Sequence, residues 1–174
     1  MQANSRFAVA IHVLALARVA RGDALGMPVT SEQMAESVNT NPVVIRRILG
    51  ALREAGLVAS QPGPGGGWRL LRRPDEISLR DVFRAVEAEP LFSLPRREPS
   101  AGCAIGKQLP AVLERCFRNA EAALEEQLDQ VTLADVIASA LASGACIHDC
   151  ADSLKTGVEF VDRAVEMEVP MTTI

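Results

Sequence analysis

The chain has 174 residues, of which 48% are hydrophobic, so it can bury a core and does not have the composition of a disordered protein. Aromatic residues make up 3% and there is no tyrosine, which argues against a binder of single-stranded nucleic acid, because such proteins stack bases on aromatic rings. The net charge of −4 is unevenly divided. Residues 1–73 hold nine arginines and four acidic residues, a net +5, so residues 74–174 carry −9. One basic half is expected of a protein with one phosphate-binding surface.

An apolar stretch over residues 7–17 lies near the N-terminus. It lacks the basic region of a signal peptide, contains His12 and is shorter than the ~18 residues of a membrane span. We interpret it as part of a core helix over residues 5–20. We therefore expect a cytoplasmic protein with no membrane partner, in which the four cysteines are thiols.

Residues 30–71 contain the signals of two helices and a β-hairpin. Thr30 and Gln33 have capping-box spacing at the start of a helix over residues 31–38. Asn41 and Pro42 are typical of the N-cap and the first position of a second helix.

Gly56 ends that second helix, since glycine tolerates the left-handed conformation. Two β-prone runs follow at residues 57–60 and 68–71, and the glycine-rich residues 62–67 between them predict a turn. Two helices joined by a tight turn and followed by a hairpin outline a winged helix-turn-helix. We predict a mainly α fold with a small β-hairpin wing, in which residues 1–88 form the DNA-binding domain.

The second helix divides into two faces. At 100° per residue its apolar side chains fall on one side, where they can pack on the first helix. The other side carries Val43, Arg46, Arg47, Gly50 and Glu54. Guanidinium groups bind guanine edges or phosphates, and glycine permits close approach, so this face suits the major groove. A solvated helix face is the alternative, and the attached turn and hairpin favour DNA reading.

The predicted DNA contacts lie on the first helix, on both helices of the helix-turn-helix and on the wing. We expect Arg47 to read a base and Arg46 to contact phosphate, and we expect the wing to lie along the backbone or enter the minor groove. The full set is Arg6, Thr30, Ser31, Asn41, Pro42, Val43, Arg46, Arg47, Gly50, Gly63, Gly65, Gly66, Gly67 and Arg69.

Beyond the wing, the sequence predicts a helix over residues 79–87, a proline-containing linker over 89–102 and a long amphipathic helix. The long helix begins between residues 103 and 109 and ends near residue 130. A helix of this length must bury its apolar stripe, so we expect it to pair with a second subunit. The predicted dimerisation residues are Leu109, Leu113, Phe117, Ala120, Leu124 and Leu128.

The dimerisation region, residues 103–142, ends with a short helix over residues 133–141. Residues 143–174 form a C-terminal tail, in which residues 153–167 have the apolar spacing of one more helix. The sequence assigns no role to this tail.

The segment over residues 55–87, AGLVASQPGPGGGWRLLRRPDEISLRDVFRAVE, resembles the Rrf-two family of bacterial transcriptional repressors. Its most specific parts are the wing tip at 63–67, the aromatic residue after it and the later Ile-Ser-Leu run. The resemblance extends over residues 5 to about 138 and implies a cytoplasmic homodimer that binds duplex DNA. Two departures predict a different operator. Pro62 precedes the wing glycines where the family often has arginine, and Arg46-Arg47 stands where cluster-binding members often have Glu-Gln.

Family members that bind an iron–sulfur cluster carry three closely spaced cysteines just before the dimerisation helix. Here Cys103 alone lies in that region and Cys116 falls on the apolar stripe, so we expect no cluster. Cys146 and Cys150 flank His148, but a zinc site needs about four ligands and no second pair is nearby, so we expect no metal. Cys103, Cys146 and Cys150 are candidate redox thiols, and the alternative is that they are idle.

The sequence contains no Gly-x-Ser-x-Gly motif and only two histidines, and its glycine run lacks the Lys-Ser/Thr and the following helix of a phosphate-binding loop. We therefore predict a sequence-specific duplex-DNA-binding regulator, a homodimeric repressor and not an enzyme. The alternative is a winged helix that binds proteins, or a thiol- or metal-sensing regulator that does not itself read DNA.

Overall fold

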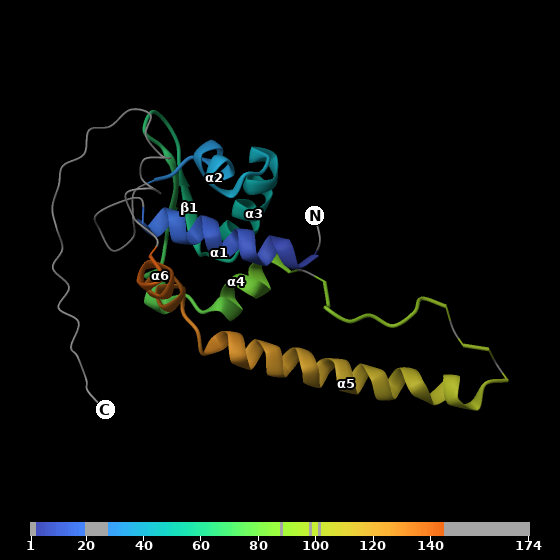
Figure 1. Ribbon diagram of the computed structural model, residues 1–174. Helices are drawn as coiled ribbons and strands as arrows, with labels where there is room; N and C mark the ends of the chain where they lie inside the picture. Colours follow the sequence, from blue (N-terminus) through green and yellow to red (C-terminus); the bar gives the residue numbers. More distant parts are fainter. Residues whose placement is uncertain (1–2, 20–27, 88, 98, 101, 145–174) are drawn as a thin grey trace, which may run out of the picture.

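The computed structural model describes residues 3–19, 28–87, 89–97, 99–100 and 102–144. It consists of a winged-helix domain and one long helix that projects from it (Figure 1). The elements in chain order are α1 (Ala3–Val19), α2 (Ser31–Val38), α3 (Pro42–Glu54), β1 (Val58–Gln61), β2 (Gly67–Leu70), the 3-10 turn η1 (Pro74–Glu76), α4 (Leu79–Val86), α5 (Ala104–Asp129) and α6 (Leu133–Ala142). The helix predicted over residues 153–167, Cys146 and Cys150 lie outside the described residues.

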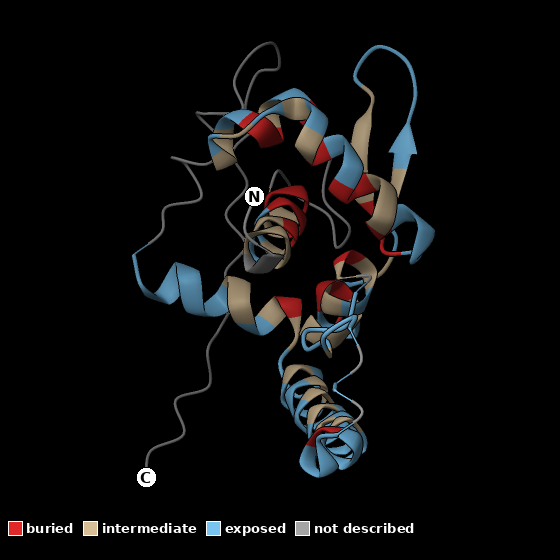
Figure 2. Ribbon diagram, turned by 90° about the vertical axis from the view of Figure 1, so that its right-hand side faces the viewer, coloured by how far each residue is buried: buried red, intermediate tan, exposed pale blue. Residues whose placement is uncertain are grey.

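Helix α1 runs through the centre of the domain, as the view along its axis shows (Figure 2). It contacts α2, α3, α4, α6 and β2. The helix begins two residues before the predicted start. The buried apolar residues of the domain form one core, which consists of Ala10, Val13, Leu14, Leu16, Ala17, Val29, Met34, Ala35, Ile45, Ile48, Leu49, Leu52, Leu57, Val58, Leu70, Ile77, Val82, Val86 and Leu133.

Both predicted helix starts in the helix-turn-helix are confirmed. The Gln33 N–H donates to Thr30 Oγ1 at 3.2 Å, and the Thr30 N–H donates to Gln33 Oε1 at 2.9 Å. Asn41 Oδ1 accepts from the Val43 N–H at 2.8 Å. Asn39, at the end of α2, has a φ of 54°, a left-handed conformation that asparagine tolerates. These local bonds fix the tight turn that sets α3 across α2.

The wing is an antiparallel pair of strands in which Val58 lies opposite Leu70. Strand β1 begins one residue later than predicted, and β2 begins one residue earlier. Val29 extends this sheet, because its N–H donates to the Trp68 carbonyl at 2.9 Å and its carbonyl accepts from the Trp68 N–H at 2.8 Å. The segment that leads into α2 is therefore joined to the wing.

Helix α5 begins and ends within the predicted limits and has 26 residues, of which Gly106 alone is buried. Its C-terminal part is attached to α4 by two ion pairs, Arg84 with Glu125 and Arg80 with Asp129, the latter at 2.8 Å. The chain then returns to the domain through α6.

Two backbone hydrogen bonds of 2.9 Å, from the Leu79 N–H to the Val131 carbonyl and from the Leu133 N–H to the Ile77 carbonyl, hold the start of α6 beside the start of α4. Leu133 is fully buried there. The far end of α5 extends away from the domain (Figure 1).

Candidate nucleic-acid interface

Helix α3 presents the two faces that its sequence predicts. Its buried residues are Ile45, Ile48, Leu49 and Leu52, which pack on the domain core. On the opposite side Val43 is 49% exposed, although valine is usually buried. A Cβ atom added to Gly50 would have no neighbour within 4 Å among the described residues, so none of them covers this part of the helix.

The two arginines of this face have different surroundings. Arg46 forms an ion pair with Glu32 of α2, and its Nε donates to Ser31 Oγ at 3.2 Å. The hydrogen bond from Arg46 holds the pKa of the Glu32 carboxyl below its ordinary value. Arg47 is exposed and forms no ion pair within the described part of the chain. The sequence did not predict that Arg46 and Ser31, both expected to contact phosphate, bind one another.

Two of the wing glycines are required by the packing of the turn itself. A Cβ atom on Gly66 would lie 2.2 Å from the Gln61 carbonyl oxygen and 2.8 Å from the Gly63 oxygen. A Cβ atom on Gly67 would lie 2.8 Å from the backbone of Val29. Both positions therefore exclude a side chain whether or not DNA is bound.

The other predicted DNA contacts are placed as follows. The Thr30 and Asn41 side-chain oxygens accept the helix-cap bonds, and the hydroxyl proton of Thr30 remains able to donate to a phosphate oxygen. Gly65 lies at the exposed wing tip, whereas Arg69 on β2 and Arg6 in the first turns of α1 are half-exposed. Contact of these residues with DNA stays a prediction.

The predicted dimerisation residues belong to two different faces of α5. Leu113, Phe117 and Leu128 are half-buried within the protomer. Phe117 stacks on Phe92 of the linker with 5.1 Å between ring centroids, and the Phe92 N–H donates to Glu121 at 3.3 Å. Part of the predicted stripe is thus already covered by the protein's own linker.

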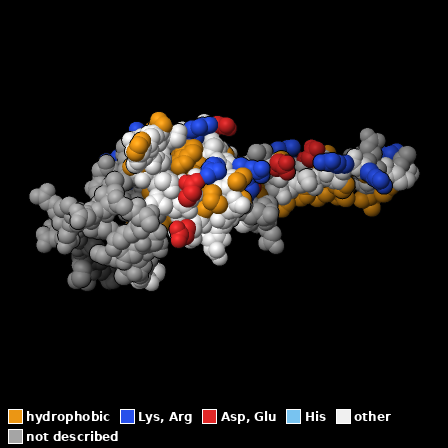
Figure 3. Space-filling view, turned by 90° about the horizontal axis from the view of Figure 1, so that it is seen from above, with side chains coloured by type: hydrophobic (Ala, Val, Ile, Leu, Met, Phe, Trp, Pro, Cys, Tyr) orange, Lys and Arg blue, Asp and Glu red, His pale blue; other side chains and the backbone are white. Residues whose placement is uncertain are grey.

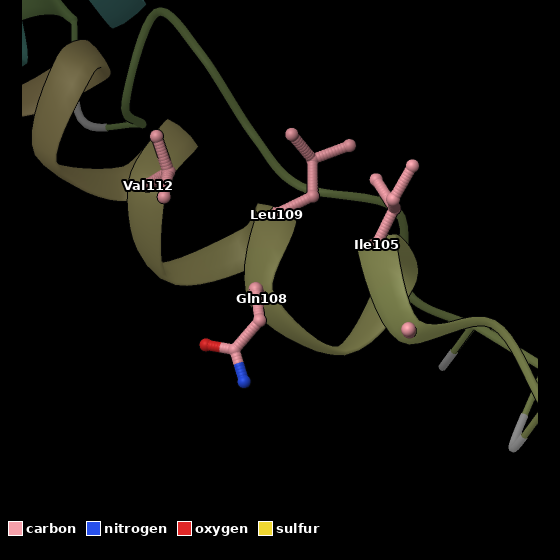
Figure 4. A pocket seen from close by; sticks show the side chains of 5 residues that line it. Ile105, Gln108, Leu109 and Val112 are labelled. Atoms are coloured by element: carbon pink, nitrogen blue, oxygen red, sulfur yellow. The ribbon is translucent and has the colours of Figure 1, made fainter.

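A second apolar face of α5 has no cover within the described residues. Ile105 is 75% exposed, and Leu109 and Val112 are each 45% exposed. They point to the same side of the helix and, with Gln108, line a shallow hollow of about 410 Å³ (Figure 4). Hydrophobic side chains follow one edge of the projecting helix (Figure 3). The predicted dimerisation residues did not include Ile105 and Val112, although the spacing of residues 105, 109, 112 and 116 in steps of four, three and four could have identified them.

The two described cysteines do not fit a cluster site. Cys103 caps α5, where its Sγ accepts from the Gly106 N–H at 3.2 Å. Cys116 lies 13 residues on, or about 20 Å along the helix at 1.5 Å per residue. Thiolates that ligate one cluster must converge on it, and these two cannot do so within one protomer. Among the residues that the structure describes, no three His, Cys, Asp or Glu side chains are grouped to hold a metal ion.

A helix-turn-helix whose second helix has an exposed face, followed by a glycine-tipped hairpin, defines a winged-helix DNA-binding regulator of transcription. The sequence agrees with this class, since residues 3–139 match the family model Rrf2, described as an iron-dependent transcriptional regulator. The chain belongs to the Rrf2 family, the Rrf-two family that its wing resembles. Like other members of that class, it is a regulator and not an enzyme.

Named relatives support this membership. YwnA of Bacillus subtilis, which is named as an HTH-type transcriptional regulator, is 37% identical over 134 residues, covering 77% of this chain and 96% of YwnA. The HTH-type transcriptional regulator IscR of Cereibacter sphaeroides is 27% identical over 79% of this chain and 86% of its own. The solved structure of T. potens IscR has a TM-score of 0.57 at 25% identity, covering 84% of this chain and 90% of that chain. None of the described helices is long and apolar enough to span a bilayer.

Proposed function

We propose that the chain acts as a cytoplasmic homodimer that binds a duplex operator through two copies of α3 and represses transcription there. The homodimer is supported by the uncovered face of α5. Large apolar side chains gathered on one edge of a projecting helix are costly to leave in water. Their spacing in steps of four and three is that of a helix paired with another helix. A dimer seated over a promoter would exclude the polymerase by occupying its site.

The oligomeric state can be measured directly by light scattering of the full chain at micromolar concentration. We expect a mass of twice 18.6 kDa. Leu109→Glu places a charge in the centre of the exposed face and should shift the mass to that of one chain. Ala111→Glu introduces the same charge on the opposite side of the same helical turn and serves as the control. A single-chain mass for the unmodified protein would remove the dimer from the proposal.

Operator binding is supported by the recognition face of α3, where the side chains of Val43 and Arg47 are exposed and Arg47 forms no ion pair with any residue that the structure describes. They lie about 40° apart around the helix at 100° per residue, so both can enter one groove. Valine can contact a thymine methyl group, and arginine can bind a guanine edge.

A gel shift with duplex DNA from upstream of the protein's own gene tests this assignment. Binding should weaken steeply between 50 and 300 mM salt, because each phosphate contact releases counterions. The same affinity at 50 and 300 mM salt, or no binding at either concentration, would favour the alternative of a winged helix that contacts proteins. Transcription from the same duplex in vitro should fall when the dimer is added, and a rise would replace repression with activation.

We also propose that the isolated protein carries no iron–sulfur cluster. The separation of Cys103 and Cys116 along α5 supports this, as does the use of the Cys103 thiol as a helix cap. The family model is described as an iron-dependent transcriptional regulator. Without an iron–sulfur cluster, this chain would sense its signal by other means.

A further inference from the structure

Arg46 does not project freely from the recognition helix. Its guanidinium pairs with Glu32, its Nε donates to Ser31 Oγ at 3.2 Å, and Ser31 Oγ donates to Glu32 Oε2 at 3.1 Å. The three side chains close a ring of hydrogen bonds between α2 and α3, which we call the Glu32 clamp. Ser31 is only 7% exposed, so one corner of the clamp is fixed to the folded domain.

The clamp changes which positive charges α3 offers to DNA. A single exposed ion pair is weak, but a network with fixed geometry and several charge-assisted hydrogen bonds holds its members more firmly. Within the clamp the Glu32 carboxylate partly offsets the charge of Arg46, and the Nε and one terminal nitrogen of Arg46 are already engaged. Arg47, with no such partner in the described chain, is left as the free guanidinium beside Val43.

If Arg46 were released from Glu32, it would strengthen binding to DNA of any sequence. On an operator, base contacts fix the position of α3, so an additional arginine must accept whatever phosphate lies within reach. On an unrelated duplex the protein can shift along the backbone to maximise phosphate contacts, which carry no sequence information. One more free guanidinium therefore strengthens non-specific binding more than specific binding.

We propose that Glu32 is a specificity-determining residue, which holds Arg46 and so keeps α3 from binding duplexes of unrelated sequence. This inference rests on the proposed DNA-binding function. Glu32 itself contacts no base and acts through Arg46. Because Glu32 and Arg46 are 14 residues apart and on different helices, only the folded structure brings the pair together.

The test compares full-length variants on two duplexes by fluorescence anisotropy. One duplex is selected from a random pool by the unmodified protein, and the other is its scrambled sequence. Glu32→Gln should bind the scrambled duplex about three- to tenfold more tightly. The slope of log affinity against log salt concentration should be steeper by about 0.9, the value of one phosphate contact. The ratio of specific to scrambled affinity should fall by a similar factor. Glu32 is exposed, so the variant should fold, which circular dichroism checks.

Glu36→Gln is the matched control, since Glu36 is exposed one turn further along α2 and forms no ion pair within the described residues. It removes the same charge but releases no arginine, so the affinity ratio should stay unchanged. Adding Arg46→Ala to Glu32→Gln should restore the ratio of the unmodified protein.

Two results would overturn the inference while leaving the proposed function intact. One is a Glu32→Gln protein that matches Glu36→Gln in affinity ratio and salt slope. The other is an Arg46→Ala protein that loses discrimination at one base pair, which would make Arg46 a direct reader. If the unmodified protein enriches no duplex from the pool, the proposed function itself fails.

Discussion

Replacing Gly66 by alanine tests the structure of the wing. The added Cβ would lie 2.2 Å from the Gln61 carbonyl oxygen and 2.8 Å from that of Gly63, both well inside an ordinary contact distance. Both neighbours are backbone atoms, so the turn itself must shift. Overpacking of this kind lowers the free energy of unfolding by about 1–3 kcal/mol. In a chain of this length the melting temperature should then fall by about 2–12 °C, at about 2–4 °C for each kcal/mol.

Urea denaturation followed by the fluorescence of Trp68 suits this test, because the protein's single tryptophan lies on β2 within the wing. The variants must be compared at equal protein concentration, since dimerisation would add to apparent stability. Gly50→Ala is the control: its Cβ meets nothing within 4 Å, and alanine in a helix should stabilise by about 0.5–1 kcal/mol. A Gly66→Ala protein with an unchanged denaturation midpoint and unchanged emission would refute the described turn.

Four further outcomes are expected. Arg47→Ala should relax the preference at one base pair by about 1–3 kcal/mol of discrimination, measured by selection from a random duplex pool. Gly50→Ala should weaken duplex binding while it stabilises the fold, because a methyl group then stands on the recognition face; unchanged affinity would show that the helix does not approach the groove so closely. Anaerobically purified protein should show neither the visible absorption of an iron–sulfur cluster nor iron in proportion to protein. Arg46→Ala should raise the pKa of Glu32 toward its ordinary value in an NMR titration. Because the folded pKa is lowered, the contribution of this pair to stability is present above the ordinary carboxyl pKa and is lost as the pH falls through the lower folded value.

The sequence predicted most reliably the features that depend on neighbouring residues. The cap at Thr30 follows from bonds between residues three positions apart, so its pattern is visible in the chain. The uncovered face of α5 was harder to predict because apolar residues occupy two adjacent faces. Only the packing of Phe92 on Phe117 shows which one is covered. The bond between Glu32 and Arg46 has no local pattern at all, since it joins two helices whose relative orientation is set by the core.

Because α5 is attached to α4 near one end, a small rotation at that end moves the other end of the helix over a larger distance. Its fixed points, Glu125 and Asp129, lie near one end, and Ile105 lies about 30 Å away at 1.5 Å per residue. A tilt of about 6° at the fixed end would move Ile105 by about 3 Å, close to the rise of about 3.4 Å between successive base pairs. If two chains join near Ile105, the same small tilt alters the distance between their recognition helices by a comparable amount. The spacing of the two recognition helices would then no longer match the two half-sites on DNA. Only a rotation at the Arg84–Glu125 and Arg80–Asp129 ion pairs is needed, and neither recognition helix changes its own shape.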